Sequence, residues 1–495
     1  MRKSLLSTAL LATAFNLGFA QSPDLSWTKH FIAPDMGLIK SIAPLPTGGY
    51  AIAGNKLIGT IGDNNRDFVV AVVDNYGNTK WSKIFGGPNY DYAENVKIDA
   101  DGNLVVVGSI QSPTVDYFPA SKGYYDVGVM KLDTSDGNVI WAKRYGGNMP
   151  DYGYSIWPTS DGGYLVGGTS ASKSDDVSAN NGLQDAWIFK LDADGTILWE
   201  KNFGTTANDY AYKAQETTDG GFVFFGTSSN DMWVVKVDAS GNEEWNKKFG
   251  GTIEEHCYYG QQTSDGGYIL CGYAKSSNGD FTTNAGEEDG WVLKLSASGT
   301  IEWKHTLASL RVDKIFSVKE TEDGGFIYTG TSENKVYIMS SITLAKLSSS
   351  GTEVWNKTLQ NSTDFYGYQM LDVIETHDDG YMLVGGIGAV QTEVFYGTLR
   401  PYFMKFGGTD NEGVTSIFSP KKSNALTLYP NPAATEFKVT IAQPMEIRIV
   451  NVLGETVLVQ QAAPGESTID VSGFAPGTYY VLAGNNSSGQ LVVVK

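Results

Sequence analysis

The feature that constrains this chain most is a repeated unit carrying one tryptophan and one glycine turn, usually Asp-Gly. The turn glycine follows the tryptophan by 21 residues in the first six units and comes four residues late in the seventh. A fixed period of this length is typical of repeat architectures, in which each unit buries its apolar face against its neighbours. The tryptophans are Trp27, Trp81, Trp141, Trp199, Trp245, Trp303 and Trp355, and the glycines are Gly48, Gly102, Gly162, Gly220, Gly266, Gly324 and Gly380.

Each unit predicts four short strands. Residues 185–226 show the pattern, with alternating or β-branched runs separated by Asp and Gly turns, as in two successive β-hairpins. Residues 400–407 have no tryptophan strand after them, while residues 25–31 have no partners before them. In a ring the first strand completes the last unit, and closure leaves only short sheet edges. We therefore expect an all-β fold, a seven-bladed β-propeller closed by the N-terminal strand and followed by a small C-terminal β-sandwich.

The composition divides the chain further. Residues 1–20 have a basic head, an apolar run and a small-residue exit, which predict a signal peptide. We expect the propeller at residues 21–408, a polar linker at 409–424 and a separate β domain at 425–495. No later apolar run reaches the length of a transmembrane helix. The net charge of -19 and pI of about 4.6 argue against nucleic acid and anionic membranes as partners.

The only two cysteines, Cys257 and Cys271, fall on paired strands of one predicted hairpin. An exported protein permits a disulfide. Counting back from the Gly266 turn, however, does not place the two residues directly opposite each other, and buried cysteines also act as small hydrophobic residues. Both interpretations stay open.

The connection between the second and third strands varies from 5 to 18 positions between units, while the other two turns are nearly constant. Variation on one face of a fixed scaffold is where repeat proteins usually bind. Exposed tyrosines in these connections are candidates for carbohydrate stacking, whereas the repeated tryptophans suit the blade core. The candidate ligand-binding residues are Tyr117, Tyr124, Tyr125 and Tyr396.

Two of the variable connections share the pattern D-x-x-x-N-x-G-x-x-D. Carboxylate and amide oxygens around a glycine bend predict a site for Ca²⁺, a cation that prefers oxygen ligands. The alternative is that Asp and Asn hydrogen-bond their own backbone in turns. The candidate metal ligands are Asp176, Asn180 and Asp185 in one loop and Asp280, Asn284 and Asp289 in the other.

A second acidic position recurs ten residues after the tryptophan and is usually followed by an aromatic residue. These carboxylates could surround one mouth of the ring and bind a cation or a basic peptide. A residue repeated in unit after unit more often has a structural role, here in holding one blade to the next. The residues are Asp91, Asp151, Asp209, Glu255 and Asp313.

Catalytic residues are not evident in the sequence. The four histidines are scattered through the repeats, and no catalytic serine, zinc, phosphate-loop or Cys-x-x-Cys motif is present. Acidic residues are numerous enough to include a glycosidase pair, so a secreted polysaccharide hydrolase or lyase stays an alternative. A structural surface component is a third. We expect a binding protein for an extracellular polysaccharide or protein, with no assigned catalytic residue and Ca²⁺ as the one candidate cofactor.

The unit Leu-Asp-x-x-Gly-x-Ile-x-Trp at Leu191–Trp199 resembles the repeat of quinoprotein-like propellers. The resemblance covers most of residues 25–407 and implies the propeller fold. Residues that would match the quinone site of that family are absent.

The C-terminal segment resembles the sorting domain of type IX secretion substrates over its whole length. The matching motifs are the Tyr-Pro-Asn-Pro opening at Tyr429, Pro430, Asn431 and Pro432, the Ala-Pro-Gly-Thr-Tyr-Tyr hairpin, and the final Lys495. The resemblance implies that the type IX machinery carries the protein across the outer membrane. It also implies cleavage of the tail, after which the protein is released or attached to surface lipopolysaccharide, and thus a secreted or outer-membrane-associated location.

Overall fold

The computed structural model describes residues 22–30, 36–58, 65–334, 339–360, 366–389, 400–408, 428–441, 445–451, 456–483 and 487–493. Within these ranges the regular elements are all strands, and no helix is long and apolar enough to cross a membrane. The chain divides into two compact units, Met1–Thr376 with Gly380–Gly407, and His377–Asp379 with Gly408–Lys495. The predicted signal peptide and linker, as well as Tyr396 and Lys495, lie outside the described residues.

The first unit consists of four-stranded sheets in the order of the chain, consistent with a propeller. The first three sheets are β2 (Met36–Pro44), β3 (Tyr50–Ile58), β4 (Asn65–Val73) and β5 (Thr79–Phe85); β6 (Asp91–Ile98), β7 (Leu104–Ile110), β8 (Asp126–Leu132) and β9 (Val139–Tyr145); and β10 (Asp151–Pro158), β11 (Tyr164–Ser170), β12 (Asp185–Leu191) and β13 (Ile197–Phe203).

Three further sheets repeat this order, and a fourth includes the first strand of the chain. They are β14 (Asp209–Glu216), β15 (Phe222–Ser228), β16 (Asp231–Val237) and β17 (Glu243–Phe249); β18 (Glu255–Gln262), β19 (Tyr268–Ala274), β20 (Asp289–Leu295) and β21 (Ile301–Leu307); β22 (Val312–Glu320), β23 (Phe326–Asn334), β24 (Met339–Leu347) and β25 (Glu353–Gln360); and β26 (Tyr366–Glu375), β27 (Tyr381–Ala389), β28 (Arg400–Phe406) and β1 (Leu25–His30).

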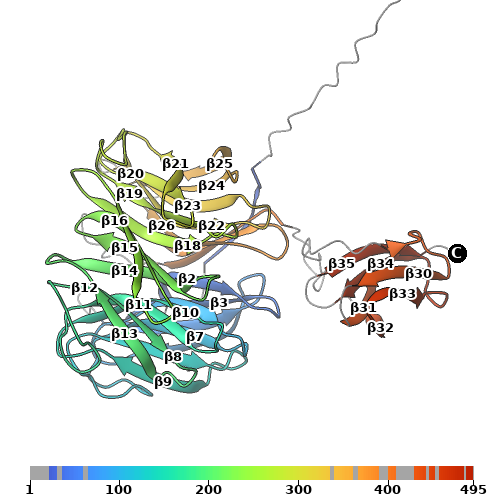
Figure 1. Cartoon of the computed structure of the whole chain (residues 1–495), viewed down its shortest axis with the longest axis horizontal. Helices are drawn as coiled ribbons and strands as arrows, with labels where there is room; N and C mark the ends of the chain where they lie inside the picture. The colour runs from blue at the N-terminus through green and yellow to red at the C-terminus, as the bar shows by residue number, and fades with distance from the viewer. Residues whose placement is uncertain are drawn as a thin grey trace, which may run out of the picture. The chain divides into compact units, whose positions relative to one another are not determined.

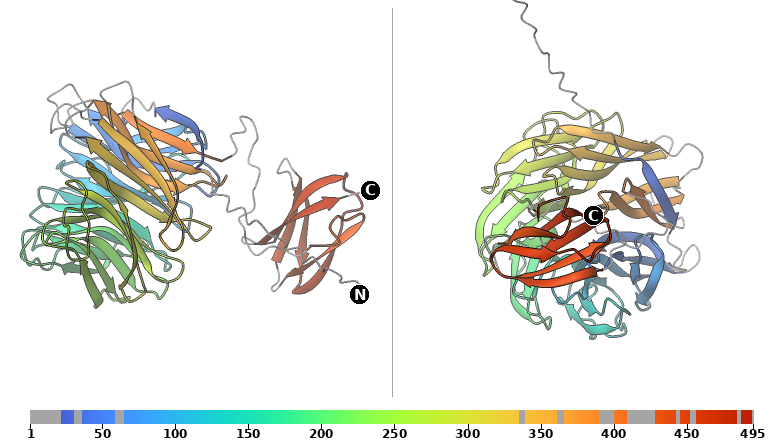
Figure 2. Two further views of the ribbon diagram at one scale, coloured as in Figure 1. Left: turned by 90° about the horizontal axis from the view of Figure 1, so that it is seen from above. Right: turned by 90° about the vertical axis from the view of Figure 1, so that its right-hand side faces the viewer.

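The sheets follow one another around a common centre (Figures 1 and 2). Strand β1 pairs antiparallel with β28, so that the last sheet contains both ends of the unit. One hydrophobic cluster joins this sheet to the first one, with Met382, Val384 and Phe403 packed among residues that include Ile39 and Val69. The last sheet therefore packs against the first.

The tryptophan of one sheet packs against the aromatic residue that opens the second strand of the next sheet. The ring centroids of Trp141 and Tyr164 are 5.8 Å apart, and those of Trp245 and Tyr268 are 5.5 Å apart. The same pairing recurs in Trp199 with Phe222, Trp303 with Phe326 and Trp355 with Tyr381. Such aromatic pairs contribute about 0.5–1.5 kcal/mol beyond their buried area. These tryptophans serve the packing between sheets, as predicted for core residues.

A β-bulge in the first strand of each sheet links it to its neighbour. The register of β10 against β11 shifts between Gly153 and Ser155, and the hydroxyl of Ser155 accepts a hydrogen bond from the Ala214 backbone of the next sheet at 3.0 Å. In the preceding sheet, the Asn95 side chain accepts one from the Ile156 backbone at 3.2 Å. Bulges re-aim side chains along a strand. Here they turn polar groups toward the neighbouring sheet.

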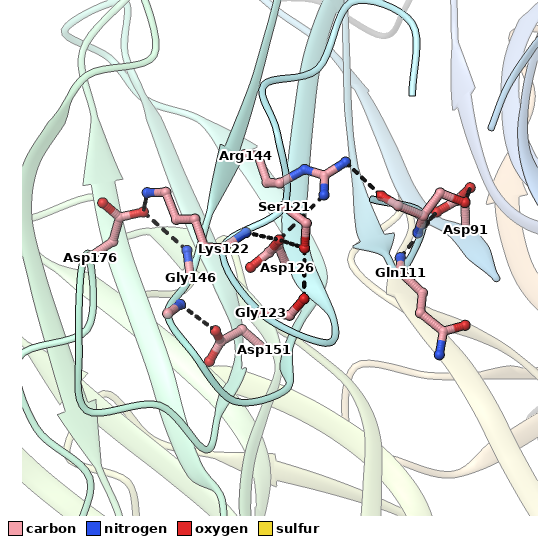
Figure 3. A network of polar contacts seen from close by, with 12 residues as sticks. Asp91, Gln111, Ser121, Lys122, Gly123, Asp126, Arg144, Gly146, Asp151 and Asp176 are labelled. Carbon is pink, nitrogen blue, oxygen red and sulfur yellow. Dashed lines mark hydrogen bonds and ion pairs between the residues drawn. The ribbon is translucent and has the colours of Figure 1, made fainter. Parts of the chain in front are cut away.

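The recurring acid that opens the first strand is buried and fixes the connection between two sheets. Asp151 accepts hydrogen bonds from the Gly147 backbone at 2.7 Å and the Ser172 hydroxyl at 2.9 Å, and it also contacts the Ser170 hydroxyl. Asp91 accepts equivalent bonds from the backbone of Gly87 and other residues. Figure 3 shows Asp91 and Asp151 in this network. The hydrogen bonds therefore support a structural role for these acids, in holding one sheet to the next.

A second buried acid, at the start of the third strand, lies beside the first across a glycine. A Cβ atom placed on Gly204 would be 2.5 Å from Oδ1 of Asp185 and 2.9 Å from Oδ2 of Asp209. At the junction drawn in Figure 3, the Arg144 guanidinium forms a buried ion pair with Asp126 at 3.4 Å. The second acid keeps one buried oxygen, Oδ1, without a hydrogen-bond partner among the described residues, both here in Asp126 and in Asp67, Asp185 and Asp289.

The two cysteines are free thiols, fully buried in neighbouring strands. The Cα partner of Cys257 is Gly272, and that of Cys271 is Tyr259, so the pair is offset in register. Burial raises the pKa of the Cys257 thiol to about 12. The two cysteines therefore act as buried hydrophobic residues and do not form the disulfide that was the other interpretation.

The second unit is a small two-sheet domain with its own core. One sheet has the order β29 (Leu428–Tyr429), β30 (Glu436–Ile441), β33 (Gly465–Asp470), and the other the order β32 (Thr456–Ala462), β31 (Met445–Asn451), β34 (Gly477–Ala483), β35 (Ser487–Val493). Phe437, Ile447, Ile449 and Val481 are fully buried in one cluster. This arrangement agrees with the predicted C-terminal β-sandwich.

The buried acids make stability depend on pH in a predictable direction. Burial raises the pKa of Asp67 and Asp151 to about 6 from 3.8, so the folded protein binds more protons than the unfolded chain between these values. Stability should therefore fall as the pH rises from about 4 to about 6.

A different set of acids acts at lower pH. Burial alone would raise their pKa, but hydrogen bonds from a threonine and a lysine outweigh it and lower the pKa of Asp161, Asp219, Asp265 and Asp323 to about 2. Their contribution is lost as the pH falls from about 4 to about 2. Urea denaturation from pH 2 to 8 should give the highest free energy of unfolding near pH 4. A steady increase from pH 4 to pH 7 would contradict this assignment.

Candidate functional site: an aromatic belt and a basic pocket

Aromatic side chains form a continuous belt along the starts of the innermost strands. Consecutive ring centroids lie between 4.5 and 6.5 Å apart over five neighbouring sheets. We define this aromatic belt by its members: Tyr90, Tyr92, Tyr125, Tyr152, Tyr154, Tyr212, His256, Tyr258 and Phe316. All nine are half-buried, so their rings are packed against each other yet still meet solvent.

The recurring acid explains why the belt is continuous. Asp91 and Asp151 are buried in their connections, and the residue after each of them, Tyr92 or Tyr152, is half-buried. Tyr154, two residues after Tyr152 in the same strand of the third sheet, is a further member of the belt. Because neighbouring sheets repeat this geometry, rings of adjacent sheets come into contact, as Tyr154 and Tyr212 do with centroids 5.1 Å apart. The sequence shows the acid followed by an aromatic residue, and this was the available signal for the belt.

His256 occupies a tyrosine position of the repeat. Its Nε2 lies 3.2 Å from the hydroxyl of Tyr212, and its ring stacks on Tyr273 with centroids 5.6 Å apart. Burial lowers the pKa of His256 to about 4. The imidazole is therefore neutral at physiological pH and acts in the belt as a polar aromatic ring.

The four tyrosines predicted to bind ligand lie in different parts of the first unit or outside the described residues. Tyr125 belongs to the belt, packed on Tyr152 at 4.9 Å, and Tyr124 is 62% exposed beside it with centroids 5.4 Å apart. Tyr117 is 67% exposed and meets Phe85 edge-on, away from the belt contacts. Tyr396 lies outside the described residues.

Farther along the same innermost strands, polar and charged side chains line a pocket. Lys97 of β6, Lys213 of β14, Lys319 of β22 and Asp372 of β26 converge there, with an empty volume of about 350 Å³ that includes its open side. Lys319 pairs with Asp372 at 3.1 Å. Three strands that carry the aromatic belt thus also carry a lysine each, and β26 adds the aspartate; we call this group of three lysines and one aspartate the basic pocket.

The other two lysines of the basic pocket have aromatic rings as neighbours. Lys97 Nζ lies 4.8 Å from the ring centroid of Trp157, and Lys213 Nζ lies 5.5 Å from that of Tyr259. Neither forms an ion pair with a residue that the structure describes. Cation–π contacts of this kind contribute about 0.5–2 kcal/mol, less than a buried ammonium loses by leaving water.

The pKa values in the basic pocket differ because Lys319 is paired with a carboxylate and the other two lysines are not paired with a described one. Burial, aided by the charge of Lys319, lowers the pKa of Lys97 to about 7, and burial likewise lowers the pKa of Lys213 to about 8. Burial opposes the charged form of Lys319 as well, yet Asp372 raises the pKa of Lys319. Burial acts against ionised Asp372, and the charges of Lys319 and Lys213 outweigh it and lower its pKa.

The predicted calcium loops make the same turn hydrogen bonds in both copies. Oδ2 of Asp176 accepts from the Gly146 backbone at 3.0 Å, as Asp280 does from Gly250. The remaining ligand candidates also have local partners: Asn180 donates to Ser170 O, Asn284 to Lys275 O, Asp185 accepts from Asn181 N and Asp289 from Ala285 N. Among the described residues, no three His, Cys, Asp or Glu side chains converge as a metal site.

The sorting motif lies at the start of the C-terminal unit. Tyr429 is 74% exposed, and Pro430, Asn431 and Pro432 are exposed as well. The next residue, Ala433, is fully buried in the core. The motif therefore presents its side chains at the surface of this domain.

Comparison with a protein family supports the assignment of the tail. Residues 427–495 match the family described as "Secretion system C-terminal sorting domain". This match supports the predicted type IX sorting tail, the involvement of the type IX machinery, and a secreted or cell-surface location. No curated protein matches the chain.

Several solved structures are similar to the chain at low sequence identity. A Lactobacillus plantarum protein is 12% identical, with a TM-score of 0.36 over 74% of this chain and 99% of that one. Prolyl oligopeptidase B from Galerina marginata is 11% identical, with a TM-score of 0.41 over 82% of this chain and 56% of that one. Drosophila Plexin A in complex with Semaphorin 1b is 9% identical, with a TM-score of 0.41 over 78% and 88%.

Calcium binding stays a prediction that a titration can decide. If an ion uses the unpartnered Oδ1 atoms of Asp185 and Asp289, calcium will raise the melting temperature, and EDTA will reverse the change. Asp185→Asn with Asp289→Asn should then abolish the shift. If the loops are turns alone, calorimetry will show neither heat of binding nor a shift in melting temperature.

Proposed function

We propose that residues 21–408 form a seven-bladed β-propeller, closed by the N-terminal strand, which binds an extracellular polysaccharide. The aromatic belt is the observation that carries this proposal. Its rings are fixed by the packing of five sheets, so a flat ligand meets a preformed surface and little conformational freedom is lost on binding. The sorting tail at 425–495 directs export and is then removed, with release or attachment to surface lipopolysaccharide.

The variable connections support a binding surface at the same end of the sheets. The connection between β15 and β16 has only Ser229 and Asn230, whereas that between β7 and β8 spans residues 111–125 and brings Tyr125 into the belt and Tyr124 beside it. Sugar rings stack on exposed aromatic faces through their apolar C–H surfaces. A protein partner is the second candidate, since tyrosine is enriched at protein interfaces.

The pairs of buried acids favour binding over hydrolysis. A glycosidase needs two carboxyl groups that reach the substrate. Asp185 and Asp209, like Asp126 and Asp151, lie next to each other but are completely buried and committed to the connections between sheets. We therefore place a secreted hydrolase or lyase second to a binding protein, and a purely structural surface component third.

Two belt substitutions test the proposal. Tyr154→Ala and Tyr258→Ala each remove one ring from the belt and should weaken polysaccharide binding about tenfold or more, which corresponds to at least about 1.4 kcal/mol. Affinity electrophoresis of the full chain in gels that contain different polysaccharides measures the effect, with melting curves to confirm that each variant is folded.

The matched control is Tyr76→Ala. Tyr76 is 44% exposed in the Asp74–Asn78 turn and lies outside the belt, so its loss should leave binding unchanged. Retained polysaccharide should be recovered intact. Recovery of shortened polysaccharide chains would favour the hydrolase instead. If no polysaccharide is retained, polysaccharide is not the ligand.

A further inference from the structure

The basic pocket is unusual because its charge opposes that of the rest of the protein. The whole chain has a net charge of -19, yet three ammonium groups face one carboxylate in the pocket. Asp372 is already paired with Lys319 and also bonded to the Ser317 hydroxyl at 2.9 Å. Lys97 and Lys213 lie beside aromatic rings, form no ion pair of their own with a described residue, and share the single charge of Asp372 with Lys319.

We propose that the basic pocket binds an anionic group, a carboxylate or a sulfate, carried by an acidic polysaccharide. This inference rests on the proposed function and specifies the class of ligand. An anion that enters between Lys97 and Lys213 supplies a second negative charge where Asp372 alone faces three lysines. Charge-assisted hydrogen bonds of this kind are shorter and stronger than neutral ones.

The lining of the pocket combines ammonium groups with aromatic rings. The ring of Trp157 lies beside Lys97 and the ring of Tyr259 beside Lys213, so each ammonium group is held next to an aromatic face. This combination matches a sugar acid, which has both an apolar ring face and a charged group. The empty volume of about 350 Å³ includes the solvent at the open side of the pocket, through which the anionic group enters.

Binding should depend on pH through the two lysines. Below about pH 7 both Lys97 and Lys213 are protonated, and both lose protons as the pH rises through about 7 and 8. Anion binding should therefore weaken between pH 6 and pH 9. The charged or titratable groups on the surrounding innermost strands are Lys40, Glu94, Lys97, Lys213, Tyr259, Lys319 and Asp372.

The test compares two forms of one polymer. Polygalacturonate and its fully methyl-esterified form share a backbone but differ in charge, and inorganic sulfate serves as a minimal probe. Calorimetry with the full chain should show binding of sulfate and of polygalacturonate, and at least tenfold weaker binding of the ester. Lys213→Met and Lys97→Met should each weaken binding of the charged probes about tenfold and leave the ester unaffected. Lys247→Met, on the exposed outer strand β17, is the matched control.

The outcomes separate this inference from the proposed function. If the protein and Lys213→Met both bind polygalacturonate and its methyl ester equally well, the anion site is wrong, whereas the proposed polysaccharide binding is supported. Sulfate binding that Lys213→Met abolishes, with no polymer retained, would support the anion site and remove polysaccharide as its source, leaving an acidic peptide. No binding of sulfate or polygalacturonate would overturn the inference.

A stability measurement provides an independent check. Lys97→Met removes an ammonium group that burial and Lys319 destabilise, and it keeps the length of the side chain against Trp157. Its melting temperature at pH 6 should be higher than that of the unchanged protein, and added sulfate should narrow the difference. A lower melting temperature would show that Lys97 is already satisfied inside the protein and would overturn the inference.

Discussion

The buried carboxylate at the start of five innermost strands is the interaction on which much of the first unit depends. Asp151 and its equivalents hold the connection that enters the strand. This fixes where the aromatic residues one and three positions after the acid enter the belt. A carboxylate without these backbone and hydroxyl donors would carry the full cost of burial. The connection, the start of the strand and the aromatic belt therefore depend on the same buried carboxylate.

Much of the fold could be predicted because its determinants are local. The first strand of the predicted segment 185–226 is observed at Asp185–Leu191, since the alternation and the flanking turns that predict it are local. The role of the tryptophans also follows from their period. The sequence does not reveal which aromatic residue of the next sheet receives Trp141, because that contact joins residues from separate repeats.

The site was predicted only in part, for a physical reason. Tyr125 belongs to the belt and Tyr124 lies beside it, whereas Tyr117 makes a contact elsewhere. Lys97 and Lys319 share one place in the repeat, 16 residues after the tryptophan, whereas Lys213 stands two positions earlier, at the bulge. A bulge changes which residues share a strand face, so the period alone does not bring Lys213 beside the other two lysines.

The pairing of β1 with β28 has a consequence for how the chain can fold. The last sheet needs residues 25–30 and residues 400–406 together, so its edge stays unpaired until almost the whole unit has been synthesised. Contacts between such distant residues form slowly, because the entropy of closing the intervening chain is lost before they are gained. The unit should therefore remain open until residues 400–406 are available, and closing the last sheet should be a late step of folding.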